Sequence, residues 1–321
     1  MGAGPALLDR RLLFFTGKGG VGKSTMAAAC ALLAAERGKR VLLVDVDAKG
    51  DVAAQFERPA VGFTPREVHP GVFAMALDTE ASLREYLRLQ LRIPVFGRLG
   101  PLARVFDFVA TAAPGVKEIL TVGKVCWEVR ESIAGRAAWD LVVVDAAATG
   151  HIVAQLGAAD AISELVDVGP VRAQTAWVAD LLADPAVSAV NVVTTPEEMP
   201  VAETIELVAR VRSDLRVALG AVVVNRVLPE LFTHADEATF AALRHDGATA
   251  VLEREAGSGV RAVLDGASLA VSLRRTRAEH LAHLRAEVDL PMLYVPYLFV
   301  RAHGLRVTRM VAASLEAELG L

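Results

Sequence analysis

The stretch from Gly17 to Thr25 combines glycines with lysines and hydroxyl side chains. Backbone N–H groups of such glycines can turn toward one anion because no Cβ blocks the approach. Lys23 is placed to neutralise the β- and γ-phosphates of a nucleotide, and the Ser24 hydroxyl to bind Mg²⁺. The pattern G-x-x-x-x-G-K-S therefore predicts a phosphate-binding loop (P-loop) for a nucleoside triphosphate with Mg²⁺. The loop residues predicted to bind the nucleotide are Gly17, Lys18, Gly19, Gly20, Val21, Gly22, Lys23, Ser24 and Thr25.

A second apolar segment ends on a carboxylate. A P-loop ATPase needs such a group at the end of a neighbouring strand, where it supports the Mg²⁺ shell. The segment Leu141–Asp145 is apolar up to its last residue. We predict that Asp145 supports Mg²⁺ together with Ser24. The alternative is an aspartate that caps a helix or a turn.

Two further aspartates, Asp45 and Asp47, follow another apolar run. Residues two apart on a strand share a face, so both carboxylates point the same way if the strand continues. Asp47 lies further out and is the better candidate to hold or deprotonate an attacking water, and to contact Mg²⁺. Asp45 is then a supporting or purely structural hydrogen-bond acceptor. A surface turn remains the alternative for Asp47.

These residues sit in a regular alternation of strand and helix patterns. Several apolar runs lack alternation, which is typical of strands covered on both faces. The pattern predicts an α/β fold with a doubly wound, mainly parallel sheet and helices on both faces. The predicted strands are Leu12–Thr16, Arg40–Asp45, Val72–Leu77, Leu141–Asp145, Val190–Thr194, Ala221–Asn225 and Leu293–Val295, and the clearest predicted helices are Ser24–Arg37, Val201–Arg212 and Gly304–Leu319.

Two segments exceed what a minimal sheet of this kind needs. We expect one P-loop domain over residues 1–321, with helical insertions at about 79–136 and 229–289. Both are expected at the carboxyl edge of the sheet, where ligands bind in such folds. For the second insertion, which carries the charged stretch from Leu273 to His280, additional packing with a solvated face is an equal alternative.

Composition narrows the class of protein. Of 321 residues, 53% are hydrophobic and 22% charged, which indicates a large core and argues against disorder. The net charge of −4 gives no reason to expect a nucleic-acid partner. Cys30 and Cys126 form no C-x-x-C pair, so neither a zinc site nor a disulfide framework is expected. No transmembrane-length run or signal peptide is visible, which predicts a cytoplasmic protein.

The motifs together resemble one family. The form from Gly17 to Ser24, with its extra Lys18, is the deviant P-loop of SIMIBI-class ATPases. The run from Val144 to His151 resembles the switch II of the ArsA and guided-entry (tail-anchored protein targeting) ATPases, and Asp47 lies where their switch I does. The overall pattern is most similar to actinobacterial ArsA-like ATPases that pair as two paralogues. Further similar segments are Val192–Glu197, Val222–Arg226, Ala113–Glu118 and Leu293–Tyr297.

The resemblance implies an ATP-driven dimer, either of two copies or with a paralogous ATPase. Lys18 would cross to phosphates bound by the partner subunit, and Asp47 would position the hydrolytic water. Asp145 would support Mg²⁺ and couple the γ-phosphate to switch II. Asn225 would hydrogen-bond adenine, and Pro296 would belong to a second base-contacting loop. ATP and ADP with Mg²⁺ are the implied cofactors, and a protein client or membrane partner is the implied output.

Departures from the family pattern limit what carries over. Switch I normally reads D-P-A-H, but here Asp47 is followed by Ala48, Lys49 and Gly50, so the stiffening proline is absent and a charge is added. Switch II likewise lacks its usual proline. The cysteine clusters that the arsenite pump subunit and the eukaryotic targeting factors use have no counterpart, and the six methionines are scattered.

Two alternative functions stay open at this stage. One is a MinD- or ParA-type spatial organiser, which would need a membrane-binding terminal helix. The apolar face around Leu305 and Leu315 favours a packed helix, because Glu316 and Glu318 oppose an anionic surface. The other is a weakly active nucleotide-binding subunit of a hetero-oligomer. If the protein lies at the inner membrane, we expect it to be held there peripherally by a partner.

Overall fold

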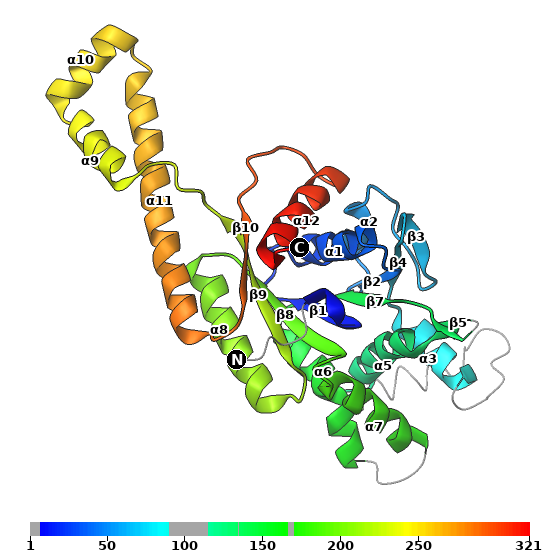
Figure 1. Cartoon of the computed structure of the whole chain (residues 1–321). Helices are drawn as coiled ribbons and strands as arrows, with labels where there is room; N and C mark the ends of the chain where they lie inside the picture. Colours follow the sequence, from blue (N-terminus) through cyan, green and yellow to red (C-terminus); the bar gives the residue numbers. More distant parts are fainter. Residues whose placement is uncertain (1–6, 90–114, 134, 166–169) are drawn as a thin grey trace.

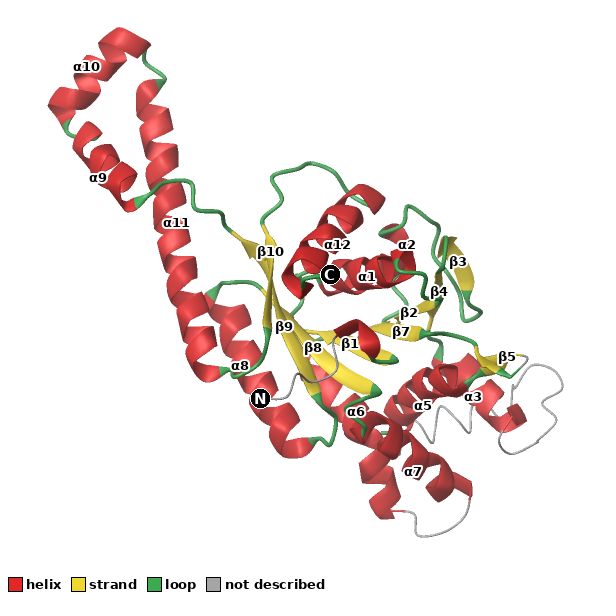
Figure 2. Cartoon of the chain, in the orientation of Figure 1, coloured by secondary structure: helices red, strands yellow, loops and turns green. Residues whose placement is uncertain are grey.

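Eight strands form one sheet in the order β10-β9-β8-β1-β7-β2-β4-β3 in the computed structural model (Figures 1 and 2). The structure describes residues 7–89, 115–133, 135–165 and 170–321. Every neighbouring pair in this sheet is parallel except β3 with β4. The predicted doubly wound, mainly parallel sheet is therefore confirmed.

All seven predicted strands are present; three are longer than predicted and two are one residue shorter. Three short strands were not predicted: β3 pairs antiparallel at the sheet edge and is mostly exposed, and β5 and β6 form a separate two-stranded ribbon. The strands are β1 Leu12–Thr16, β2 Val41–Asp45, β3 Arg66–His69, β4 Val72–Ala76, β5 Ser132–Ile133, β6 Arg136–Ala137, β7 Leu141–Asp145, β8 Ser188–Thr194, β9 Leu219–Val227 and β10 Met292–Pro296.

Helices cover both faces of the sheet (Figure 1). One face is covered by η1, α1, α2 and α12, and the other mainly by α5, α6, α7 and α8. The helices are η1 Leu7–Asp9, α1 Lys23–Glu36, α2 Asp51–Ala54, α3 Thr79–Leu89, α5 Val116–Arg130, α6 Thr149–Leu165, α7 Pro170–Ala183, α8 Glu198–Asp214, α9 His234–Leu243, α10 Asp246–Ala256, α11 Val260–Glu287 and α12 Leu305–Leu319.

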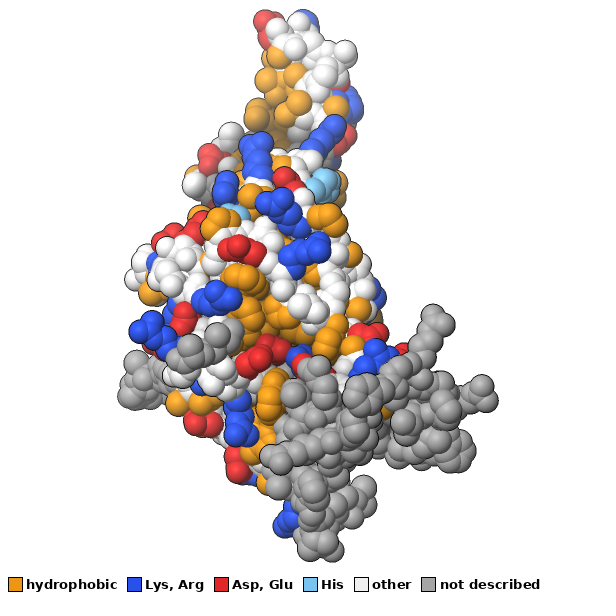
Figure 3. Space-filling model, turned by 90° about the vertical axis from the view of Figure 1, so that its right-hand side faces the viewer, with side chains coloured by type: hydrophobic (Ala, Val, Ile, Leu, Met, Phe, Trp, Pro, Cys, Tyr) orange, Lys and Arg blue, Asp and Glu red, His pale blue; other side chains and the backbone are white. Residues whose placement is uncertain are grey.

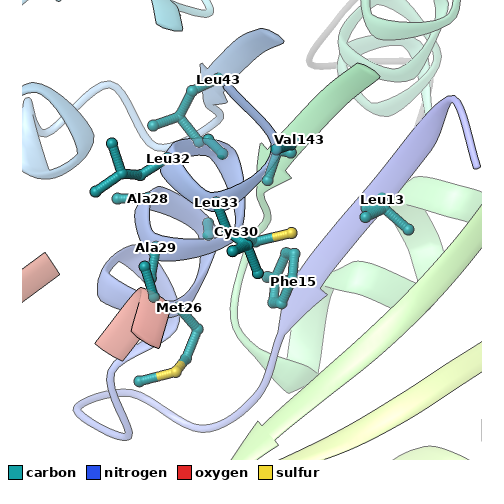
Figure 4. Close-up of a cluster of buried hydrophobic side chains, with 14 of the residues drawn as sticks. Leu13, Phe15, Met26, Ala28, Ala29, Cys30, Leu32, Leu33, Leu43 and Val143 are labelled. Atoms are coloured by element: carbon teal, nitrogen blue, oxygen red, sulfur yellow. The ribbon is translucent and has the colours of Figure 1, made fainter. Parts of the chain in front are cut away.

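The two cores follow from the strand period of two. On β1, Leu13 and Phe15 point into the core under α1, whereas Leu12 and Phe14 point into the core on the opposite face. Figure 4 shows the first of these cores, with Cys30 of α1 beside Phe15. All these side chains are at most 1% exposed, so the strand that carries the glycine-rich loop is held firmly from both sides.

An arm of three helices, α9, α10 and α11, protrudes from the body (Figure 1). It lies within the second predicted insertion and leaves the sheet at the carboxyl end of β9. The helix α11 has 28 residues, of which Leu264 and Leu284 are buried. Figure 3 shows hydrophobic side chains on the protruding arm, with charged side chains interspersed below it. Val251 of α10 and Val263 of α11 are exposed.

The root of the arm is tied to the sheet by arginines of the charged stretch. Arg274 Nε donates to the carbonyl of Leu228 at 3.3 Å, and Arg277 Nη1 to the carbonyl of Arg226 at 3.4 Å. Arg277 also pairs with Glu197 at 3.2 Å. This part of the stretch is therefore not merely a solvated face, because it bonds the chain just beyond Asn225.

The last helix, α12, packs against the body. Val311, Ala312 and Leu315 are buried in the core that also holds α1, and Arg37 of the turn after α1 pairs with Glu316 at 3.0 Å. The packed alternative for this helix is confirmed. In the part of the chain that the structure describes, no helix combines the length and apolar character needed to cross a membrane.

Candidate nucleotide-binding site

The glycine-rich loop joins the carboxyl end of β1 to the start of α1. Gly17 has φ 148°, and a Cβ at this position would lie 2.1 Å from the carbonyl oxygen of Val193 on β8. Only glycine fits so close to backbone. Gly20 and Gly22 also have positive φ, at 85° and 101°. The loop conformation thus depends on the glycines that the sequence pattern singled out.

The amino end of α1 has no side-chain cap. Its N-cap is Gly22, in the left-handed region, and no side chain accepts from the first N–H groups of the helix. These groups and the helix dipole therefore remain available to an anion. Lys23 Nζ lies 3.4 Å from the carbonyl oxygen of Lys18, so it folds back over the loop.

A pocket of about 340 Å³ opens directly in front of this loop. Residues from the loop, from the ends of β2 and β7, and from α2 contribute to its walls. It brings together the predicted Lys23, Ser24, Asp47 and Asp145. The lining residues are Gly19, Gly20, Gly22, Lys23, Ser24, Thr25, Asp45, Asp47, Lys49, Asp51, Gln55, Asp145 and Ala146.

Asp145 sits deep in this pocket with unused bonding capacity. The parallel register places it beside Phe15 of β1 and Asp45 of β2. The residue is 8% exposed, and its Oδ1 has no hydrogen-bond partner among the described residues. Burial raises the pKa of Asp145 to about 6, and the nearby Asp45 adds to this rise while the Ser24 hydroxyl opposes it.

These features fit a bound Mg²⁺. A buried carboxylate oxygen without a partner, next to the Ser24 hydroxyl and at the mouth of a phosphate cradle, is a ligand set that Mg²⁺ accepts. Among the described residues no group of three or more His, Cys, Asp or Glu could hold a metal.

Asp45 has a structural role. Its Oδ1 accepts from the Ala48 N–H and its Oδ2 from the Gly50 N–H, both at 2.9 Å. Burial raises the pKa of this carboxyl, and the two N–H bonds oppose the rise. Because both oxygens are engaged, Asp45 shapes the loop that carries Asp47. Of the two roles open to it from the sequence, the structure shows the structural acceptor.

Asp47 lies on the rim of the same pocket. Its side chain is 48% exposed, and Oδ2 is 3.0 Å from Lys49 Nζ. The following Ala48 has φ 54°, so the loop turns sharply where the family pattern has a proline. Asp47 therefore faces the pocket from a turn that Asp45 holds, and a cation from its own loop already contacts it.

Lys18 points away from the pocket. Its ammonium forms an ion pair with Glu203 Oε1 on α8, and Glu203 Oε2 accepts from Thr149 Oγ1 at 3.2 Å. Thr149 is the first residue of α6 and belongs to the switch II segment. A second bond, from Thr16 Oγ1 to the Ala147 carbonyl at 2.8 Å, also ties the P-loop strand to switch II.

Asn225 packs against the glycine-rich loop through a hydrogen bond to Val21. It is 8% exposed, its Nδ2 donates to the Val21 carbonyl at 2.8 Å, and its Oδ1 accepts from the Arg226 N–H. Arg226, near the carboxyl end of β9, has φ 58°, and the pairing register with β10 shifts there. Pro296 is exposed at the end of the adjacent β10. The structure thus places these two residues on neighbouring strands, with Asn225 against the P-loop.

Three residues of the site were not predicted. Glu203 carries no local signal, because its contacts with Lys18 and Thr149 join distant parts of the chain. Gln55 accepts from Thr25 Oγ1 at 3.3 Å and lines the pocket, but it directly follows the short α2, where no sequence pattern marks it. Lys49 appeared only as a departure from the switch I pattern.

The start of the P-G-x-x-E motif, 113–114, lies outside the described residues. Gly115, which follows it, precedes α5 and has φ 95°.

Several known proteins are similar to this chain in sequence. The family model for the anion-transporting ATPases matches residues 10–168 and 154–254. ATPase BagA of Mycobacterium tuberculosis is 36% identical over 225 residues, which cover 68% of this chain and 66% of the relative. An arsenical pump-driving ATPase of Escherichia coli is 30% identical over 267 residues, covering 76% and 42%. ATPase GET3 of Podospora anserina is 28% identical over 151 residues, covering 46% and 43%.

The alignments cover just under two thirds of the mycobacterial relative and less than half of the other two. The family match itself extends from before β1 to within α10 and includes the P-loop, both switch segments and Asn225. A site built on the P-loop at the carboxyl edge of a parallel sheet agrees with this match. The chain belongs to the anion-transporting ATPase family.

Proposed function

We propose that this protein binds ATP with Mg²⁺ and hydrolyses it. The observation that carries the proposal is Asp145, a buried carboxylate with an unpartnered oxygen that faces the P-loop across one pocket. A buried carboxylate oxygen without a partner destabilises the fold, so its presence is best explained by a cation that binds it. A site that binds phosphate alone would not need this carboxylate.

Each residue has a role in this reaction. The glycine-rich loop and the amino end of α1 bind the phosphates, and Lys23 neutralises the β- and γ-phosphates. Asp145 and Ser24 hold Mg²⁺, which supplies charge neutralisation when bound. Asp47, on the pocket rim, orients the attacking water and lies close enough to the Asp145 carboxylate to influence its pKa. Asn225 and Pro296 contact the base.

We extend the proposal to an ATP-gated dimer, formed with a second copy or with a paralogous ATPase. ATP closes the dimer, hydrolysis opens it, and the change binds or releases a protein client or a membrane partner. Family membership and Lys18, which lies outside the ATP pocket of its own subunit, support this reading. The location we propose is cytoplasmic, with peripheral membrane association through a partner.

ATP turnover by purified variants tests the enzymatic proposal. Lys23→Ala should abolish detectable ATP binding. Asp47→Asn should retain ATP binding and lower the hydrolysis rate by about 100-fold, the lower range of general-base effects. Asp180→Asn makes the same charge change on the exposed surface of α7 and serves as the control. Turnover by Asp47→Asn at the wild-type rate would show that Asp47 does not position the water.

A weakly active subunit of a hetero-oligomer is the second candidate. The observation that favours it is the ion pair between Asp47 and Lys49, which engages the proposed water-positioning carboxylate. Turnover by this chain alone would then be low and would rise on addition of a paralogous ATPase. The MinD- or ParA-type reading is less favoured, since α12 is packed in the core rather than free to bind a membrane.

A further inference from the structure

The two lysines of the P-loop face in opposite directions. Lys23 lines the phosphate pocket, and the carbonyl of Lys18 is its one described hydrogen-bond partner, at 3.4 Å. Lys18 is absent from the pocket wall, and its ammonium is paired with Glu203 on α8. The loop therefore commits only one of its cations to the nucleotide of its own subunit.

Glu203 contacts two functional segments at the same time. One carboxylate oxygen pairs with Lys18 in the P-loop, and the other accepts from the Thr149 hydroxyl at the end of switch II. Both Lys18 and Glu203 side chains are 30% exposed. The glutamate thus connects the P-loop to switch II outside the ATP pocket, on a surface that a partner can reach.

We infer that Glu203 is a positioning residue that holds Lys18 within its own subunit until a partner subunit presents its phosphates. This inference rests on the proposed ATP-gated dimer. When Lys18 turns to the partner's phosphate, Glu203 loses its cation and the Thr149 contact is no longer held in place. Binding by one subunit thereby changes the environment of switch II in the other.

The strength of the contact suits such a role. A partly exposed ion pair contributes little to stability because water screens it and both side chains lose rotamer freedom. A charge-assisted bond from Lys18 to a phosphate is stronger, since the acceptor is highly charged and the closed interface excludes water. The pair is therefore stable enough to direct Lys18 in the free subunit and weak enough to exchange.

Acylation of lysines in the nucleotide-free monomer tests the contact directly. With an amine-reactive ester and mass spectrometry, Glu203→Gln should raise the acylation rate of Lys18 by about fivefold, the factor that an exposed ion pair provides. Glu206→Gln is the matched control, because Glu206 is exposed on the same helix and has no ion pair among the described residues. The exposed Lys117 is the internal reference. An unchanged Lys18 rate in Glu203→Gln would overturn the inference.

Loosening of the whole fold would have a different signature. Lys39 is half-buried and donates to the Leu8 carbonyl at 2.5 Å, so its acylation reports general opening. If Lys39 also becomes more reactive in Glu203→Gln, the test is repeated with the variant Thr149→Val. It removes only the second bond to Glu203 and should raise the Lys18 rate by a smaller factor, about twofold. No rise in Lys18 acylation in that variant would count against the inference.

Dimerisation measured by sedimentation with a non-hydrolysable ATP analogue separates this inference from the proposed function. Two such ion pairs break per homodimer, so Glu203→Gln should tighten the dimer by roughly 25-fold relative to wild type and Glu206→Gln. Equal dimer affinity in all three would overturn the role of Glu203 while leaving the dimer intact. Nucleotide binding without a dimer in any of them, alone or with a paralogue, would instead refute the dimer itself.

Discussion

Lys49 Nζ lies 3.0 Å from Asp47 Oδ2, within the loop that Asp45 holds in place. If Asp47 orients the attacking water, this ion pair competes with it. Lys49→Ala should therefore raise the ATP turnover rate by about two- to fivefold, the range for an exposed pair of this kind. A steady-state phosphate-release assay measures it, with Lys117→Ala as the control for removal of an exposed lysine. A fall in turnover would indicate that Lys49 itself contacts the nucleotide.

Alanine at Gly17 tests how strictly the loop conformation is fixed. The added Cβ would lie 2.1 Å from the Val193 carbonyl oxygen at a positive φ. We expect Gly17→Ala to lower the free energy of unfolding by about 3 kcal/mol or more. Gly19 has open space around its Cβ position, so Gly19→Ala should change it by less than about 1 kcal/mol. Urea unfolding without nucleotide compares them, and equal losses would contradict the crowding argument.

The raised pKa of Asp145 predicts that the stability of the ligand-free protein depends on pH. Its pKa of about 6 is above the value near 4 expected in the unfolded chain, so the folded state holds the proton between these values. The contribution of Asp145 to folding therefore falls as pH rises from about 4 to 6, by about 3 kcal/mol in total. Asp145→Asn should remove this contribution and be more stable than wild type at pH 7.5.

The same variant tests the metal role through urea titrations with and without Mg²⁺-ATP. Wild type should gain stability from the ligand at pH 7.5, and Asp145→Asn should lose most of that gain. Ser24 gives a second test: Ser24→Ala should also reduce the gain from the ligand, but its ligand-free stability at pH 7.5 should fall, because the Ser24 hydroxyl no longer opposes the rise in the Asp145 pKa. Lower ligand-free stability of Asp145→Asn at pH 7.5 would contradict the burial argument.

Asn225 separates base recognition from phosphate binding. Its amide bonds the Val21 carbonyl, so Asn225→Ala affects the loop as well as any contact with adenine. Calorimetric titrations with ATP, GTP and inorganic tripolyphosphate distinguish these effects. If Asn225 reads the base, the variant should lose about tenfold in ATP affinity, bind tripolyphosphate as wild type does, and no longer favour ATP over GTP. Equal losses for all three ligands would assign Asn225 to the loop alone.

The two cysteines should behave as core residues. Cys30 and Cys126 are fully buried, and burial raises the pKa of the Cys30 thiol to about 12 and that of Cys126 still higher. Neither thiol should react with a disulfide reagent at pH 8 until the protein unfolds. A spectrophotometric thiol assay with and without denaturant measures this. Rapid reaction in the native protein would show an opening that exposes α1 or α5.

The sheet could be predicted from the sequence because its central strands are buried on both faces. Continuous apolar runs such as Leu141–Asp145 mark strands of this kind, and the P-loop fixes the order of β1 and α1. The edge strand β3, with the sequence Arg-Glu-Val-His, could not be recognised, because it is short and mostly exposed. It pairs with β4 in a hairpin across Pro70 and Gly71, and its four residues are too few to show a clear alternation.

The candidate site shows the same division. The P-loop and Asp145 follow from residue type and position, and the structure brings them to one pocket. The role of Asp45 stayed open, because the direction of two backbone N–H groups decides it and composition does not reveal that direction. The role of Glu203 could not be predicted for a related reason. In the sequence it is one glutamate among several in a helix, and only the packing of α8 beside the P-loop brings it to Lys18.

The arm has the geometry of a lever. The part of α11 that lies beyond Arg277, from Val260 to Arg277, spans about 26 Å, so a rotation of about 10° at that root displaces the far end by roughly 4.5 Å. Arg277 fixes that root to Arg226, the residue that follows Asn225. A backbone shift of less than an ångström beside Asn225 would therefore be geometrically amplified at α10, where a fluorescent label pair would detect it.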